Sequence, residues 1–87
     1  KSCIINTFAN IEHDVVIGDY CHISTGAIIN GNCKIGRGTF FGSQSVMVNG
    51  LGIAEECVIS VGSVVSKDLK QKGIYWANPG LLKKILK

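Results

Sequence analysis

A six-residue spacing of large apolar side chains runs through most of this sequence. From Ile5 to Val65, every sixth position holds a large apolar residue, and no step needs an insertion. A helix repeats about every 3.6 residues and a strand about every 2 residues, so neither element explains this period. We therefore expect a repeat in which each unit contributes one large inward side chain. These positions are Ile5, Ile11, Ile17, Ile23, Ile29, Ile35, Phe41, Met47, Ile53, Ile59 and Val65.

Six residues suffice for one short strand and one corner, and three such sides close a triangular coil of about 18 residues. Successive coils stack at the usual strand spacing of ~4.8 Å, which places side chains one coil apart above one another. The sequence thus predicts an all-β fold, a parallel β-helix of about 3.7 coils filled by three ladders. The ladders are Ile5, Ile23, Phe41, Ile59, then Ile11, Ile29, Met47, Val65, and finally Ile17, Ile35, Ile53.

A second series of mostly small residues lies four places after each large one, and all the cysteines fall in its phase. Cys3, Cys21, Cys33 and Cys57 are therefore expected to be reduced thiols that pack as small apolar side chains. Their spacings match no zinc motif. Cys3 and Cys21 would be stacked neighbours, which leaves a disulfide between them open. Reduced core thiols favour a cytoplasmic location.

The predicted β-helix covers residues 1–73, and its few coils leave open strand edges at both ends. We therefore expect oligomerisation, a missing neighbouring domain, or both. Residues 74–87 are predicted to form an extended segment, a turn and a short helix that packs on the coils, because the last apolar residues have helical spacing. We expect no signal peptide and no membrane-spanning segment.

The net charge of +3 is concentrated toward the C-terminus. The basic residues after position 66 form either a solvated tail or a surface that attracts a polyanionic ligand. Aromatic residues are not interleaved with them, so nucleic acid is not an expected partner. These residues are Lys67, Lys70, Lys72, Lys83, Lys84 and Lys87.

His13 is the candidate for acid–base chemistry. It lies two places after an inward isoleucine and is therefore expected at an exposed corner. The residue above it in the next coil is Gly31, whose backbone a ligand can approach closely. Asp14 follows at once, and a carboxylate beside a histidine fixes its tautomer and supports its role as a base. An ordinary solvated His-Asp pair is the alternative, and His22 falls on a different side of the coil.

Several stretches resemble the hexapeptide-repeat acyltransferases, which are left-handed parallel β-helices. Ile17-Gly18-Asp19 and Ile35-Gly36-Arg37 carry the general likeness. Ile11-Glu12-His13-Asp14 and Cys21-His22-Ile23-Ser24 are similar to the sugar acetyltransferase branch of that family. This branch includes sialic-acid O-acetyltransferase-like enzymes and N-acetyltransferases of nucleotide-linked 4-amino sugars. Asn78-Pro79-Gly80 resembles the Asn-Pro-Ala that closes the repeat in the family.

The resemblance implies an acetyl-CoA-dependent acetyltransferase that modifies an amino or hydroxyl group of a sugar or nucleotide-sugar. His13 would be the general base, Asp14 would orient it, and the backbone N–H of Gly31 would face the thioester oxygen. Acetyl-CoA would be bound by residues from several coils, and basic residues near the C-terminus would meet its phosphates. By resemblance, the residues that bind it are His22, Gly31, Ser43, Val61 and Lys67.

The same resemblance implies a homotrimer with each active site between two subunits. Full-length relatives carry an N-terminal α/β domain that holds the nucleotide-sugar, and this sequence does not contain it. We therefore expect either a fragment with an incomplete acceptor site or a short variant with another acceptor.

Two other functions are open. A non-catalytic β-helix, used for trimerisation or as a scaffold, needs the ladders but not His13. A γ-type carbonic anhydrase on the same fold needs three zinc-binding histidines gathered across a subunit boundary, and this chain has only two histidines, so no metal is expected. The acceptor and the acetylated atom, nitrogen or oxygen, are both left open by the sequence.

Overall fold

The computed structural model describes residues 2–75, which form short strands joined by corners. Within this range, no helix has the length and hydropathy needed to cross a membrane. The strands are β1 Ile4–Ile5, β2 Asn10–Ile11, β3 Val16–Ile17, β4 His22–Ile23, β5 Ile28–Ile29, β6 Lys34–Ile35, β7 Phe40–Phe41, β8 Val46–Met47, β9 Gly52–Ile53, β10 Val58–Ile59, β11 Val64–Val65 and β12 Ile74–Tyr75.

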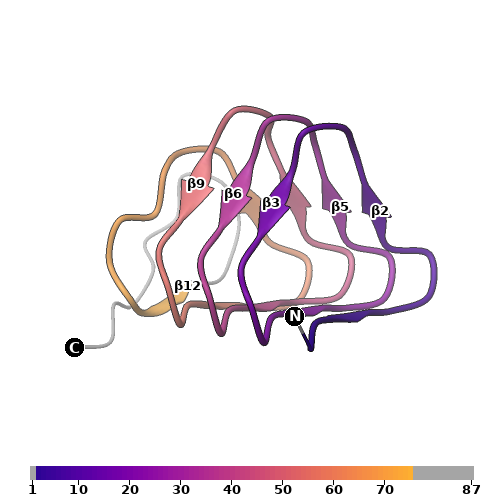
Figure 1. The fold of residues 1–87 in the computed structure, drawn as a ribbon, viewed down its shortest axis with the longest axis horizontal. Helices are drawn as coiled ribbons and strands as arrows, with labels where there is room; N and C mark the ends of the chain where they lie inside the picture. The colour runs from indigo at the N-terminus through magenta and orange to yellow at the C-terminus, as the bar shows by residue number, and fades with distance from the viewer. Residues whose placement is uncertain (1, 76–87) are drawn as a thin grey trace.

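These strands form three parallel sheets around one axis (Figure 1). The five-stranded sheet has the order β1-β4-β7-β10-β12, the four-stranded sheet β11-β8-β5-β2 and the three-stranded sheet β3-β6-β9. Up to β11, every third strand lies in the same sheet, because the chain turns one corner after each strand. The result is a parallel β-helix of about four turns, which confirms the predicted fold class.

The strand registers confirm the three predicted ladders. Ile5 pairs with Ile23, Ile23 with Phe41, and Phe41 with Ile59. Ile23, Phe41 and Ile59 are fully buried because a strand lies on either side of each. Ile5 is 46% exposed, since no strand lies beneath it within residues 2–75. The well-packed core therefore begins with the second coil.

The corners share one backbone conformation that the sequence shows only in part. A residue with φ between 57° and 80° recurs at every sixth position. Glycine fills four of these positions, and residues with side chains fill the others, because stacking of the coils imposes the bend whatever the residue. They are Ser2, Phe8, Asp14, Tyr20, Gly26, Asn32, Gly38, Gln44, Gly50, Glu56 and Gly62.

The small inward-facing residues donate side-chain hydrogen bonds to backbone carbonyls at the corners of the next coil. Ser45 Oγ donates to the carbonyl of Ser60 at 2.8 Å, and Thr39 Oγ1 donates to that of Ala54 at 3.2 Å. The thiol of Cys21 donates to the carbonyl of Gly36 at 3.2 Å. No disulfide joins any of the cysteines, all of which lie within residues 2–75, and burial raises the pKa of the Cys21 and Cys57 thiols. The prediction of reduced packing thiols is confirmed, and the open Cys3–Cys21 disulfide is not formed.

The last coil is shorter than the others. Ile59 pairs with Tyr75, a step of 16 residues (59 to 75), and Ile53 bridges to Leu69 with the same step. Tyr75 is 8% exposed and caps the first ladder, and its hydroxyl donates to the carbonyl of Gln71 at 2.6 Å. The β-helix thus continues to residue 75, beyond the boundary at 73 that the sequence suggests. The predicted C-terminal turn and helix, and the lysines after position 76, lie outside the described residues.

Candidate active site

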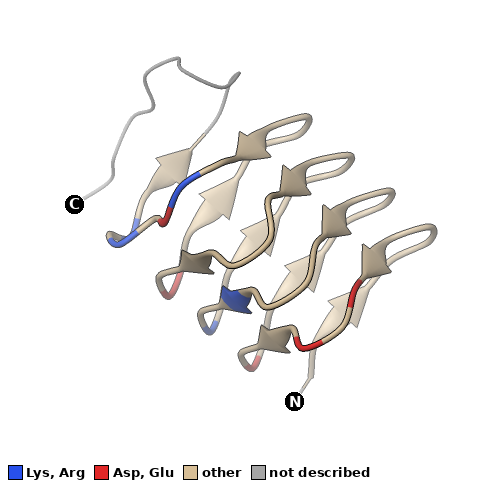
Figure 2. Ribbon diagram, turned by 90° about the horizontal axis from the view of Figure 1, so that it is seen from above, with Lys and Arg blue, Asp and Glu red and all other residues tan. Residues whose placement is uncertain are grey.

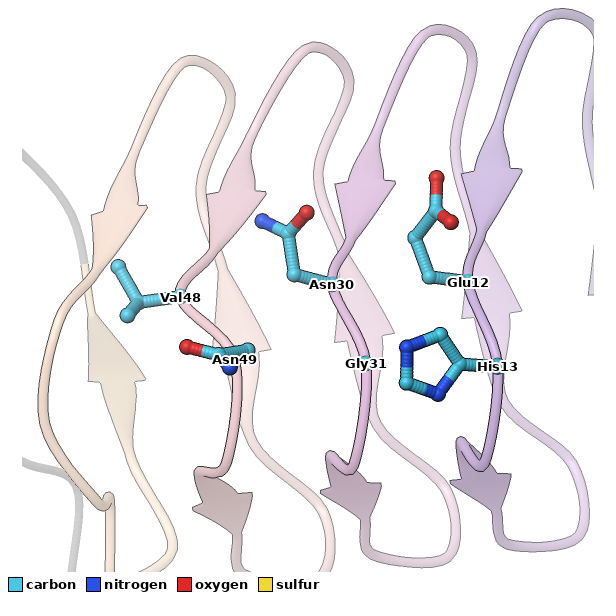
Figure 3. A pocket seen from close by; sticks show the side chains of 6 residues that line it. All are labelled: Glu12, His13, Asn30, Gly31, Val48 and Asn49. Atoms are coloured by element: carbon cyan, nitrogen blue, oxygen red, sulfur yellow. The ribbon is translucent and has the colours of Figure 1, made fainter.

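An open depression lies on the bends that follow β2, β5 and β8, here called the His13 corner. Each of three successive coils contributes two adjacent residues to its lining (Figure 3). The three pairs stack because the coils keep the same register through this part of the chain. The lining residues are Glu12, His13, Asn30, Gly31, Val48 and Asn49.

The imidazole of His13 lies against the backbone of Gly31. A Cβ atom added to Gly31 would be 2.8 Å from Cε1 and 2.9 Å from Nε2 of that ring. Gly31 is buried and is not in the left-handed region, so it is the ring, and not the backbone conformation, that requires glycine here. The predicted placement of His13 beneath a glycine bend is confirmed.

Asp14 turns back onto the same histidine. Its Oδ2 lies 3.2 Å from His13 Nδ1, and the left-handed conformation of Asp14, with a φ of 58°, belongs to the bend that brings the two side chains together. When Nδ1 carries the ring proton and donates it to this carboxylate, Nε2 keeps its lone pair. The free nitrogen is one of the two ring atoms nearest to Gly31.

Backbone hydrogen bonds tie the His13 corner together but leave the N–H of Gly31 free. The N–H of Asn32 donates to the carbonyl of His13 at 3.1 Å, and the N–H of Gly50 donates to that of Gly31 at 2.9 Å. The N–H of Gly31 makes no hydrogen bond within residues 2–75. It is therefore available to an oxyanion beside the imidazole.

Glu12 and Asn30 add polar groups that the sequence analysis did not single out. The side-chain amide of Asn10 donates to Glu12 Oε2, and the amide of Asn30 donates to the carbonyl of Met47 at 2.8 Å. Both residues lie one place before the His13 ladder, at positions 12 and 30. The one-coil register that joins His13 to Gly31 could have identified them.

Known proteins share the repeat and the fold. No protein-family model matches the chain. The carnitine operon protein CaiE of Escherichia coli O7:K1 is 36% identical over 63 residues, covering 72% of this chain and 31% of CaiE. The acyl-[acyl-carrier-protein]–UDP-N-acetylglucosamine O-acyltransferase of Thermodesulfovibrio yellowstonii is 38% identical over 77 residues, covering 84% of this chain and 27% of that enzyme. Together with the stacked hexads, these likenesses show that the chain is similar to hexapeptide-repeat acyltransferases.

A solved structure supports the fold of this hexapeptide-repeat chain independently. The acetyltransferase domain of PglB from Neisseria gonorrhoeae FA1090 superposes with a TM-score of 0.70 at 18% identity, covering 98% of this chain and 52% of that one. Likeness at this level of identity shows the β-helix fold. The chain spans less than a third of the length of the two curated relatives described above.

The remaining predicted site residues lie elsewhere on the hexapeptide-repeat chain. His22 is on the outer face of β4, where Nε2 lies 2.9 Å from the amide nitrogen of Asn6 and the ring lies 5.0 Å from that of Phe40. Ser43 and Val61 are on the corner between the five-stranded and four-stranded sheets. A single chain therefore joins His13, Asp14 and Gly31, but not these three residues.

Lys67 lies at the far end of the His13 corner. It follows Val65 of β11 by two places, as Asn49 follows Met47 of β8, and those two strands are paired. Its side chain is exposed. Within residues 2–75, no group of three or more histidine, cysteine, aspartate or glutamate side chains is arranged to hold a metal ion.

Proposed function

We propose that this hexapeptide-repeat chain carries the reaction centre of an acetyl-CoA-dependent acetyltransferase that acts on an amino or hydroxyl group of a sugar or nucleotide-sugar. The observation that carries the proposal is the stacking of His13 on Gly31, with Asp14 on one ring nitrogen and the other nitrogen free. A base, an orienting carboxylate and an unpaired backbone N–H are the groups that acyl transfer requires.

The reaction would proceed through a tetrahedral intermediate. Nε2 of His13 removes a proton from the acceptor nitrogen or oxygen as that atom bonds to the thioester carbonyl carbon. The carbonyl oxygen becomes an oxyanion, which the N–H of Gly31 stabilises. The carbon–sulfur bond then breaks, and the coenzyme A thiolate takes the proton from the His13 imidazolium. Asp14 holds the ring in one tautomer throughout.

The comparisons support acyl transfer in general terms. The Thermodesulfovibrio relative is by name an acyltransferase acting on UDP-N-acetylglucosamine, and the structural neighbour is an acetyltransferase domain. Acetyl as the group transferred, and coenzyme A as its carrier, are part of the proposal. Reduced cysteines and acetyl-CoA both fit a cytoplasmic location.

We further place the complete site between copies in a homotrimer. The side chain of His13 is 72% exposed on one chain, and acyl transfer is favoured when water is excluded. His22, Ser43 and Val61 lie on other sides of the chain, so in this arrangement a neighbouring copy supplies them to the donor. The outer faces of the sheets expose apolar side chains such as Phe40, Val58 and Val64, which a neighbouring copy would cover.

Acetyl-CoA titration followed by melting is the first test. Ligand at 100 times its dissociation constant should add ~2.7 kcal/mol to the free energy of unfolding. Thiol release with amino-sugar and hydroxy-sugar acceptors should then fall by roughly 100-fold or more in His13→Ala, which keeps the wild-type melting temperature because the ring is exposed. A melting temperature that does not rise when acetyl-CoA is added would instead support a scaffold role. Equal thiol-release rates in wild type and His13→Ala would show that the histidine takes no part in the reaction.

A further inference from the structure

The His13 corner is acidic in its first coil, and at its far end a lysine lies in register beside Asp68. Glu12 lines the depression in the first coil, and Asp14 is bonded to His13 there. Among the residues lining the depression, none is lysine or arginine. The basic residue in register, Lys67, lies three coils away, roughly 14 Å at the usual strand spacing. Figure 2 shows acidic positions in the first coil and both acidic and basic positions in the later ones.

Glu12 is held in place beside the imidazole. Residues 10 and 12 are two places apart, and the Asn10 amide donates to Glu12 Oε2. Figure 3 shows the Glu12 and His13 side chains projecting together toward the next coil. Oε1 of Glu12 makes no hydrogen bond within residues 2–75, so one carboxylate oxygen is left for a ligand.

The two carboxylates have different partners. Asp14 uses Oδ2 on the Nδ1 side of the histidine, which leaves Nε2 for the acceptor. Glu12 contacts no cation within residues 2–75, and so its charge is uncompensated in the depression. A neutral hydroxyl would compensate none of that charge, whereas an ammonium group would both donate to it and neutralise it.

We propose that the acceptor is a primary amine on a sugar, bound as its ammonium ion, and that Glu12 is the residue that recognises it. This inference rests on the proposed function and chooses nitrogen over oxygen as the atom acetylated. Lys67, at the other end of the corner, then lies on the side of the donor, whose phosphates are anionic. Val48, exposed between the two ends, offers an apolar surface to the arm of the donor.

The proton balance follows from the charge of the acceptor. The ammonium group loses one proton to solvent as the amine is released toward Nε2. The amine nitrogen then bonds to the thioester carbon and passes its second proton to His13. When the carbon–sulfur bond breaks, that proton goes to the thiolate. The products are the N-acetyl sugar, free coenzyme A thiol and one proton released per turnover.

The test compares acceptors that differ only in carrying a hydroxyl or an amino group. The panel pairs hexoses and UDP-hexoses with their amino-deoxy counterparts, and acetyl-CoA is saturating. Wild type should acetylate the amine with kcat/KM at least about 10-fold above the matched hydroxyl compound. Glu12→Gln, which keeps the shape and can still accept from Asn10, should raise KM for the amine roughly 10- to 100-fold and change the hydroxyl reaction far less. Added salt should weaken amine binding in wild type but not in Glu12→Gln.

Two further variants complete the design. Glu55→Gln removes an exposed carboxylate outside the depression and should keep the wild-type preference. Asn10→Ala should shift KM for the amine in the same direction as Glu12→Gln but less. Preference for the hydroxyl acceptor, or an unchanged preference in Glu12→Gln, would overturn this inference alone. Absence of transfer to every acceptor would overturn the proposed function with it.

Discussion

The imidazole of His13 lies where a side chain on Gly31 would have to be. The added Cβ would come within 2.8 Å of the ring, closer than side-chain atoms pack. The two residues thus define one position for the ring, and the free N–H of Gly31 is held beside it.

Gly31→Ala should therefore damage activity without unfolding the protein. The methyl group displaces the exposed imidazole, and a misplacement of about 1 Å can cost roughly 100-fold in rate. Gly52→Ala is the matched control, because its added Cβ meets nothing closer than 3.9 Å and its φ is not left-handed. Thiol-release rates and melting temperatures would be measured for both. Unchanged activity in Gly31→Ala would show that the ring position is not required.

Asp14→Gly removes the carboxylate but keeps the backbone bend, and so it tests the two contributions separately. Glycine adopts the φ of 58° without strain, so the free energy of unfolding should hold or rise by about 1 kcal/mol. The rate of transfer should fall on the order of 10- to 100-fold, since the histidine loses its orienting partner. Glu56→Gly removes a carboxylate at another left-handed corner. It should relieve the same backbone strain and keep its activity. Equal losses in both variants would point to the corner and not to the carboxylate.

Gly42→Ala should destabilise the β-helix itself. The added Cβ would lie 2.5 Å from the carbonyl oxygen of Ile59 and 2.7 Å from the carbonyl carbon of Ser60, both backbone atoms that cannot move aside. We expect a loss of about 1–3 kcal/mol in urea denaturation, with Gly52→Ala again near wild type. A variant as stable as wild type would mean that the coils can separate locally at little cost.

Alkaline pH should weaken the fold. Burial raises the pKa of the Cys21 and Cys57 thiols above 9.0 and that of the Tyr75 hydroxyl above 10.0, their ordinary values. These groups are neutral when protonated, so above the ordinary values the unfolded chain has lost protons that the folded chain keeps. The free energy of unfolding should thus be at its full value below about pH 9 and decline above it.

Urea denaturation at several pH values from about 7.5 to 10 measures this decline. A variant with both Cys21→Ala and Cys57→Ala should be less stable at neutral pH but should show a shallower fall. A free energy of unfolding that rises with pH across this range would contradict the raised pKa values of these groups.

The period of six was sufficient to predict the ladders, the three sheets and the pairing of His13 with Gly31. These features follow from regular stacking, in which one register determines all others. The departures occur where stacking is interrupted. Ile5 is half-exposed because nothing lies beneath it in the described chain, and Tyr75 enters the core because the last coil is short. A strict period could not anticipate either.

The candidate site was predictable in part for the same reason. His13, Asp14 and Gly31 follow from the register and from ordinary chemistry at a corner. Glu12 did not stand out, because an acidic residue on a strand end is usually solvated, and only its bond from Asn10 marks it. The placement of His22 on another side was foreseen, but its partners Asn6 and Phe40 were not.

Because all coils share one register, the His13 corner is sensitive to insertions and deletions in the repeat. Inserting one hexad between Gly31 and Asn49 would leave every inward residue inward, yet it would rotate all later coils by one side of the triangle. Asn49 and Lys67 would then face a different sheet from His13. Length changes that preserve this corner must therefore add or remove whole turns of the β-helix.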